Sequence, residues 1–134
     1  MRTTTIAVAV LLSASAARAE LPIGFAKALH AVETSGRTGA ILGDGGAARG
    51  PLQIHRGYWK DAVEYDRSIG GRYEDVQNLE YATRIVDAYM RRYARKAYDA
   101  KDCETLARVH NGGPAGASKT ATLAYWAKVR RHLK

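Results

Sequence analysis

The chain has 134 residues, with 21 Lys and Arg against 13 Asp and Glu, a formal net charge of +8 and one cysteine. This length allows one domain with one modest core. The single Cys103 excludes a disulfide within the chain, so the domain must be stabilised by packing. The positive charge favours an acidic partner, such as a wall glycan, a lipid headgroup or released nucleic acid.

The first 19 residues have the pattern of a secretory signal peptide. Arg2 provides a positive start, residues 6 to 12 form an apolar run, and Ala17-Arg18-Ala19 gives the small-x-small motif of a cleavage site. The apolar run is too short to span a bilayer, and no other segment approaches the required length. We therefore expect cleavage before Glu20, and a secreted or periplasmic protein of residues 20 to 134 with one domain and a net charge of +6.

The first half of this domain is expected to contain a helix followed by a glycine-rich lobe. The helix is indicated by apolar residues at helical spacing, namely Leu21, Phe25, Leu29 and Val32, and Gly36 suits the left-handed position that ends a helix. Glycines at 43, 45, 46 and 50 predict a small β-hairpin or an irregular lobe. A short extended piece at 52 to 54 and a brief helix near 58 to 65 follow.

The second half is expected to contain three helices. The longest runs over 79 to 97 with Asp75 as its N-cap, and its outer face is basic. A solvated cationic face is the usual outcome for such a helix, so we expect no nucleic acid partner. Asp102 caps a helix over 102 to 110, and a last helix over 117 to 132 uses an apolar stripe of Leu123, Trp126, Val129 and Leu133. The predicted class is α+β, mostly α.

Two acidic residues eleven positions apart lie in contrasting settings. Glu33 is in the last turn of the first helix, close to its apolar face, where burial and the helix dipole both favour the protonated acid. Asp44 lies between glycines in a tight turn, where backbone N–H donors favour the ionised form. Glycoside hydrolysis needs such a pair, with one carboxyl as proton donor and the other as anion.

The pair by itself is a weak signal. Glu is common near helix ends, and Asp-Gly is first of all a turn signal. Cys103 lies between two acids that would raise its pKa, so we interpret it as a small buried helix residue rather than a nucleophile. No pair of histidines and acids has the spacing of metal ligands, and we expect no cofactor.

Several motifs together are more specific. Glu33, Asp44-Gly45-Gly46, Gly50-Pro51-Leu52-Gln53-Ile54 and His110-Asn111-Gly112-Gly113-Pro114 follow one another in an order that resembles the invertebrate-type, or destabilase-like, lysozyme family. The resemblance covers nearly all of residues 20 to 134. It implies a lysozyme-like fold that cleaves the β-1,4 bond between N-acetylmuramic acid and N-acetylglucosamine in peptidoglycan, with Glu33 as proton donor and Asp44 as nucleophile or stabiliser.

The resemblance also implies saccharide contacts. Carried over position by position, they fall on His55, Arg56, Gly57, Tyr58, Trp59, Lys60, Asp61, Tyr93, His110, Asn111 and Gly112. Tyr58 and Trp59 can place aromatic faces against a pyranose, and Gln53, His55 and Asn111 can hydrogen-bond to its polar groups. Three of these residues also have a structural alternative to saccharide contact. Trp59 can belong to the core, Gln53 can bond the backbone of the hairpin, and His110 can cap its helix.

The chain departs from this family in its cysteines. Relatives usually carry many, paired in disulfides, and only Cys103 is found here. The departure bears on loop rigidity and on the isopeptidase activity reported for some relatives, but it removes neither carboxylate. A proteinaceous lysozyme inhibitor is a further partner that the resemblance implies.

Other functions are compatible with the same residues. A lytic transglycosylase would use Glu33 as both acid and base and would release anhydro sugars. A wall-binding module would bind peptidoglycan without turnover, and a cationic membrane-disrupting protein would kill without Glu33. For a hydrolase, carboxyl oxygens about 5 to 5.5 Å apart favour retention of configuration and a gap of about 6.5 to 9.5 Å favours inversion. The resemblance implies retention.

Overall fold

The computed structural model describes residues 20–134, so the expected signal peptide over 1–19 lies outside the described residues. Within these residues the fold consists of a small sheet and six α-helices: α1 (Phe25–Thr34), α2 (Arg56–Tyr65), α3 (Leu79–Tyr93), α4 (Arg95–Asp99), α5 (Cys103–Gly112) and α6 (Leu123–Arg130). Short 3₁₀ helices lie at Asp44–Gly46, Arg67–Ile69, Tyr73–Gln77, Gly116–Ser118 and Thr120–Thr122. The expected α+β, mostly helical class is confirmed.

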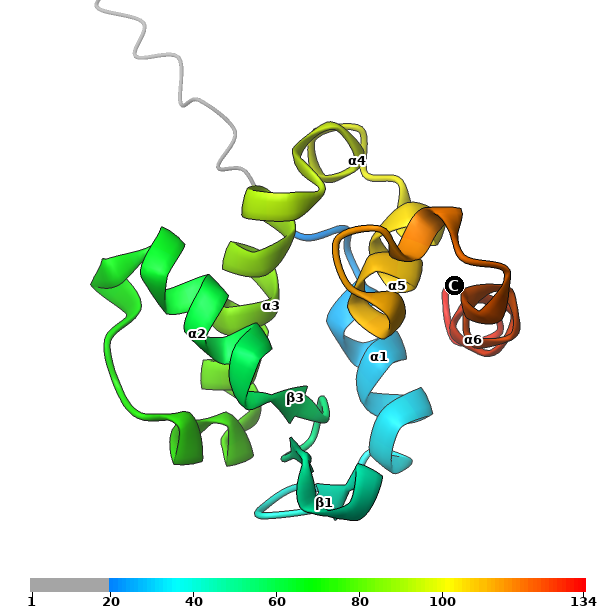
Figure 1. Cartoon of the computed structure of the whole chain (residues 1–134). Coiled ribbons are helices and arrows are strands. Elements are labelled where there is room, and N and C mark those ends of the chain that lie inside the picture. The colour runs from blue at the N-terminus through cyan, green and yellow to red at the C-terminus, as the bar shows by residue number, and fades with distance from the viewer. Residues whose placement is uncertain (1–19) are drawn as a thin grey trace, which may run out of the picture.

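The sheet lies at the C-terminal end of α1 (Figure 1). Its strands β1 (Leu42–Gly43), β2 (Ala48–Arg49) and β3 (Ile54–His55) are antiparallel in that order. Leu42 pairs with Arg49, and Ala48 pairs with His55. This is the expected hairpin lobe, and β3 leads directly into α2, which begins two residues before the predicted start at Tyr58.

The long second-half helix begins at residue 79, as predicted, but its N-cap and its C-terminal end differ from the prediction. The N-cap is Asn78, whose side chain accepts a hydrogen bond from the Tyr81 N–H at 3.0 Å. Asp75 is wrong as the cap, because it lies in the preceding 3₁₀ helix and accepts from the Arg72 N–H. Ala94 (φ −137°, ψ 41°) ends α3, so the helix expected over 79 to 97 is divided into α3 and α4.

The last two helices confirm one prediction and correct another. The Asp102 side chain caps α5 by accepting from the Thr105 N–H, as expected. Helix α6 begins at Leu123 rather than near residue 117, because two 3₁₀ turns precede it. Leu123 is 45% exposed, which contradicts its place in the apolar stripe, while Tyr125 and Val129 turn inward.

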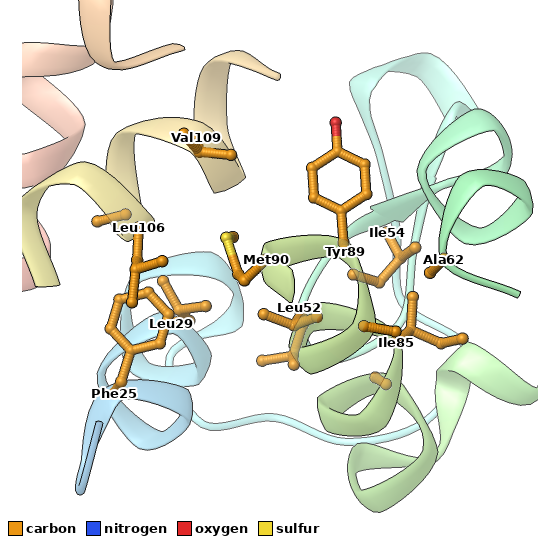
Figure 2. Packing of buried hydrophobic residues seen from close by; sticks show 14 of the residues in the cluster. Phe25, Leu29, Leu52, Ile54, Ala62, Ile85, Tyr89, Met90, Leu106 and Val109 are labelled. Carbon is orange, nitrogen blue, oxygen red and sulfur yellow. The ribbon is translucent and has the colours of Figure 1, made fainter. Parts of the chain in front are cut away.

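The core joins α1 to α3 and α5 (Figure 2). Phe25 and Leu29 of α1 pack with Met90 of α3 and Leu106 of α5, and all four side chains are fully buried.

Cys103 is half-buried at the start of α5, where burial and the charge of Asp102 raise the pKa of its thiol. Among residues 20–134, no helix is long and apolar enough to cross a membrane.

Candidate active site

Glu33 lies in the last turn of α1, as expected. Ser35 (φ 55°) and Gly36 (φ 76°) both adopt left-handed conformations that end the helix. The Thr34 hydroxyl donates to the Pro51 carbonyl at 2.9 Å, which ties the helix end to the segment before β3. The Glu33 side chain is only 18% exposed. Its Oε1 accepts a hydrogen bond from the Tyr125 hydroxyl of α6 at 2.7 Å.

His110 of α5 lies beside the same carboxyl oxygen. Its Nε2 is 3.5 Å from Glu33 Oε1 and 3.2 Å from the Leu52 carbonyl oxygen, and its Nδ1 is 3.0 Å from the Tyr58 hydroxyl. Burial, with the nearby Tyr89 and Glu33, raises the pKa of Tyr58 well above its ordinary value. Tyr58 therefore remains a donor to Nδ1, and the Nε2–H of His110 points toward Leu52.

Three tyrosine rings continue from His110 along α2 and α3. Tyr58 stacks on Tyr89 with ring centroids 3.6 Å apart, and Tyr89 meets Tyr93 at 4.8 Å. Burial raises the pKa of Tyr89 to about 12. Burial and a hydrogen bond with Asp61 raise the pKa of Tyr93. The three rings are therefore neutral. Because Tyr89 is only 4% exposed, the half-buried Tyr58 and Tyr93 are the members of the row that retain surface for contact with the apolar side of a sugar ring.

Asp44 lies in the tight turn between β1 and β2, as expected. Its φ of 49° and those of Gly45 and Gly46 are all positive, a run that glycine permits at low cost. Its Oδ2 is 2.9 Å from His55 Nε2, and the two side chains are 70% and 52% exposed. The glycines of this turn predicted backbone N–H donors at the Asp44 carboxylate, whereas its partner in the structure is the His55 ring.

Both carboxyl groups are linked to one short segment. The Glu33 carboxyl lies beside His110, which also contacts the Leu52 carbonyl. The Asp44 carboxyl contacts His55, which follows Leu52 by three residues. Because three extended residues span at most about 10 Å, the backbone positions of Leu52 and His55 are no further apart than this. A sheltered carboxyl group and an exposed one are therefore each connected, through one histidine, to the stretch 52–55. Acid-assisted glycoside cleavage requires such a contrast between the environments of its two carboxyl groups.

Two of the expected saccharide ligands have structural contacts. The Gln53 amide donates to the carbonyls of Ile41 at 3.1 Å and Gly50 at 3.0 Å, so it holds the hairpin, which was its alternative interpretation. Trp59 is half-buried against the core, and its Nε1–H donates to the Tyr81 hydroxyl at 2.9 Å.

The remaining expected ligands lie on α2 and at the end of α5. Arg56, Gly57 and Lys60 are exposed on α2, and Asp61 is half-buried there, with its carbonyl accepting from Arg92. Asn111 is exposed, and the Gly112 carbonyl accepts from Lys119 Nζ at 2.6 Å. Their roles toward a saccharide stay predictions.

Tyr125 is the site residue that the sequence analysis missed. Its spacing of four from the inward Val129 could have placed it on the buried face of α6. Its contact with Glu33, however, joins residues 92 positions apart and follows only from the packing of α6 against α1. Burial and the neighbouring Glu33 charge raise the pKa of Tyr125, so its hydroxyl remains a donor.

A mostly helical domain with a three-stranded antiparallel sheet beside the end of the first helix has a lysozyme-like fold. The crystal structure of Tapes japonica lysozyme matches it with a TM-score of 0.69 and 27% identity, covering 83% of this chain and 89% of that one. A second structure, of Meretrix lusoria lysozyme in complex with Aeromonas hydrophila PliI, gives a TM-score of 0.70 and 29% identity, with the same coverage.

The family model described as Destabilase matches residues 28–132, and the chain belongs to this family of invertebrate-type lysozymes. It is 34% identical over 94 residues to the lysozyme of Meretrix lusoria, covering 69% of this chain and 74% of the relative. It is 42% identical over 82 residues to Lysozyme 1 of Crassostrea virginica, covering 60% of this chain. The match spans 42% of that relative's length.

Proposed function

We propose that the protein is a muramidase that hydrolyses the β-1,4 bond between N-acetylmuramic acid and N-acetylglucosamine in peptidoglycan. The observation that carries the proposal is the pairing of a sheltered Glu33, held by Tyr125 beside His110, with an exposed Asp44 that His55 connects to the same stretch, 52–55. The relatives named lysozyme support the same activity.

Glu33 is the proton donor in this proposal. The recorded contacts of its carboxyl, from Tyr125 and His110, both involve Oε1. Oε2 is therefore the oxygen that carries the transferable proton and delivers it to the glycosidic oxygen. The half-buried position limits competition from water, which strengthens the interaction of this acid with the departing sugar.

Asp44 provides the negative charge. As the bond to the leaving oxygen breaks, the anomeric carbon becomes oxocarbenium-like, and the Asp44 carboxylate stabilises or attacks it. Its Oδ2 is held by His55, which leaves Oδ1 for the sugar. A water then completes hydrolysis with Glu33 acting as base, and we expect retention of the anomeric configuration.

The test uses purified peptidoglycan and two matched variants. Glu33→Gln removes the acid and keeps the size of the side chain, while Glu80→Gln makes the same change at an exposed position on α3. We expect Glu33→Gln to reduce turnover by at least about 100-fold and Glu80→Gln to leave it unchanged. Parent-like clearing by Glu33→Gln would refute the assignment, and anhydro muropeptides in mass spectra would identify a transglycosylase instead.

We also propose export and inhibition by a protein partner. The motif at Ala17-Arg18-Ala19 supports cleavage before Glu20, and N-terminal sequencing of protein recovered outside the cytoplasm would test it. The Meretrix lusoria lysozyme was solved in complex with PliI from Aeromonas hydrophila, which supports a similar inhibitor for this chain. Inhibition of turnover by purified PliI is the expected result, and full activity at saturating PliI would contradict it.

A further inference from the structure

The charges of this chain are divided unequally along its length. Residues 20 to 104 contain 13 Lys and Arg and 13 Asp and Glu, so this part is formally neutral. Residues 105 to 134 contain six Lys and Arg and no acid. The whole excess of positive charge in the domain therefore lies in α5, α6, the segment that joins them and the four residues after α6.

Ion pairs engage some of the cations in each part, among them Arg108, which pairs with Glu104. Arg91 forms ion pairs with Asp66 and Asp87, and Arg95 pairs with Asp99. At the C-terminal end, four exposed cations form what we call the α6 basic patch: Lys128, Arg130, Arg131 and Lys134. Within the part of the chain that the structure describes, none of the four takes part in an ion pair.

The α6 basic patch lies close to the candidate active site. Tyr125 and Val129 face the domain interior, and Tyr125 donates to Glu33. Lys128 follows Tyr125 by three residues, which is about 5 Å along a helix axis. Figure 1 places α6 beside α1 and α5, with the C-terminus next to α6. One helix thus carries a contact to Glu33 on its inner side and unpaired cations on its outer side.

We propose that the α6 basic patch binds the carboxylates of peptide-substituted peptidoglycan and so selects this substrate over neutral glycans such as chitin. The proposal rests on the proposed muramidase function and names its substrate class. Stem peptides place carboxylates along the glycan strand, and so do lactyl groups that carry no stem peptide. The cations of a segment that itself contains no acid, beside the candidate site, complement these charges.

The same observations argue against a membrane as the partner. A helix that lies in a bilayer interface needs an exposed apolar face opposite its cationic one. In α6 the apolar side chains of Tyr125 and Val129 are buried in the domain, and Leu123 is the single large hydrophobic of the helix that is markedly exposed. The outer face of α6 is therefore cationic, and the helix lacks the exposed apolar face that would insert into a bilayer.

The experiment measures binding in the catalytically silent Glu33→Gln chain. The patch variant changes Lys128, Arg130, Arg131 and Lys134 to Gln. The control variant changes four exposed cations elsewhere to Gln: Lys27, Arg67, Arg72 and Arg84. Both variants lose four positive charges, so a difference in their binding depends on the positions of the charges and not on their number. Co-sedimentation is measured with insoluble peptidoglycan at low salt, in native form and with its carboxyl groups amidated.

The expected result is a dissociation constant for native peptidoglycan that rises about 10-fold in the patch variant and less than about 2-fold in the control. The difference should vanish on amidated peptidoglycan and at about 1 M salt, where charges are screened within about 3 Å. Equal binding by the two variants, or an undiminished difference on amidated wall, overturns the proposal. Patch-dependent binding to phosphatidylglycerol vesicles with unchanged wall binding overturns it in favour of a membrane.

Turnover by the chain with Glu33 intact separates the two proposals. If the parent binds the wall through the α6 basic patch but releases no fragments, the muramidase function fails and the binding surface stands. If the patch variant binds and cuts native peptidoglycan like the parent, the function stands and the binding surface fails.

Discussion

The Tyr125 hydroxyl donates a hydrogen bond to Glu33 Oε1 at 2.7 Å, although the two residues are 92 positions apart. The contact joins the last helix of the domain to the end of the first. Because burial and the Glu33 charge raise the pKa of Tyr125, the hydroxyl keeps its proton throughout the physiological range. It therefore orients Glu33 and stabilises the ionised carboxylate that remains after proton transfer.

Tyr125→Phe should lower turnover by about 10-fold, because one charge-assisted hydrogen bond is lost from the acid. The loss should appear in kcat, with KM close to that of the parent. Tyr98→Phe is the control: Tyr98 is buried and donates to Asp87 at 2.7 Å. This control variant should lose stability without a loss of kcat. A kcat of Tyr125→Phe equal to that of the parent would contradict the role.

Much of the fold follows from local signals in the sequence. The stripe of Phe25 and Leu29, the capping by Asp102, and the glycines around Asp44 each act over a few residues, and the structure confirms what they predicted. Local signals did not predict where the long helix of the second half is divided into two. The Leu79 to Ala97 periodicity continues past Ala94, but the backbone turns there, so only Ala97, the last residue of the pattern, lies in the separate helix α4.

The candidate site was predicted in part, because the identity and spacing of residues do not reveal their partners. Glu33 and Asp44 occupy the expected helix end and turn. The histidines behave differently from simple sugar ligands: His55 contacts Asp44, and His110 links Glu33, Leu52 and Tyr58. These contacts join segments up to 77 positions apart, and tertiary packing sets them.

Asp44→Asn should reduce hydrolysis by at least about 100-fold while leaving the stability unchanged, since the side chain is 70% exposed. His55→Gln should reduce it only a few-fold, because the histidine positions one oxygen of Asp44 and is itself half exposed. Steady-state rates on soluble glycan fragments give both values. An Asp44→Asn chain that retains parent activity would favour a transglycosylase that needs Glu33 alone.

His110→Phe should destabilise the domain by about 1 to 3 kcal/mol, because the Tyr58 hydroxyl and the Leu52 carbonyl both lose a buried partner. Urea unfolding measures this loss. In the parent, ¹⁵N NMR should find the proton of neutral His110 on Nε2, as the Tyr58 donor requires. A proton found on Nδ1 instead would refute the arrangement in which Tyr58 donates.

Acid should weaken the domain in part through Asp66. The Ser68 hydroxyl, followed by Arg91, holds the pKa of Asp66 below its ordinary value of 3.8. A lowered pKa in the folded state contributes stability that is complete above 3.8 and is lost as the pH falls through the lower folded value. Asp66→Asn should therefore cost about 1 kcal/mol at neutral pH. Its unfolding free energy should converge with that of the parent as the pH falls below the folded pKa of Asp66. A constant difference at all pH values would contradict this origin.

Two glycines that flank β3 should respond in opposite ways to alanine. Gly50 has a φ of +80°, and an added Cβ would lie 2.3 Å from the Val76 carbonyl oxygen, so Gly50→Ala should lower the stability by more than about 1 kcal/mol. Gly57 lies in α2 with no atom within 4 Å of an added Cβ, so Gly57→Ala should raise it by about 0.5 to 1 kcal/mol.

The Gly57 variant also tests a predicted saccharide contact. If Gly57 meets the substrate only through its backbone, Gly57→Ala should keep the parent KM while its thermal midpoint rises. A KM increased by more than about 10-fold with the stability gain intact would show that a sugar lies where the new methyl group stands, since one steric clash of this size costs about 1.4 kcal/mol or more. Thermal unfolding and steady-state kinetics on the same preparation distinguish these outcomes.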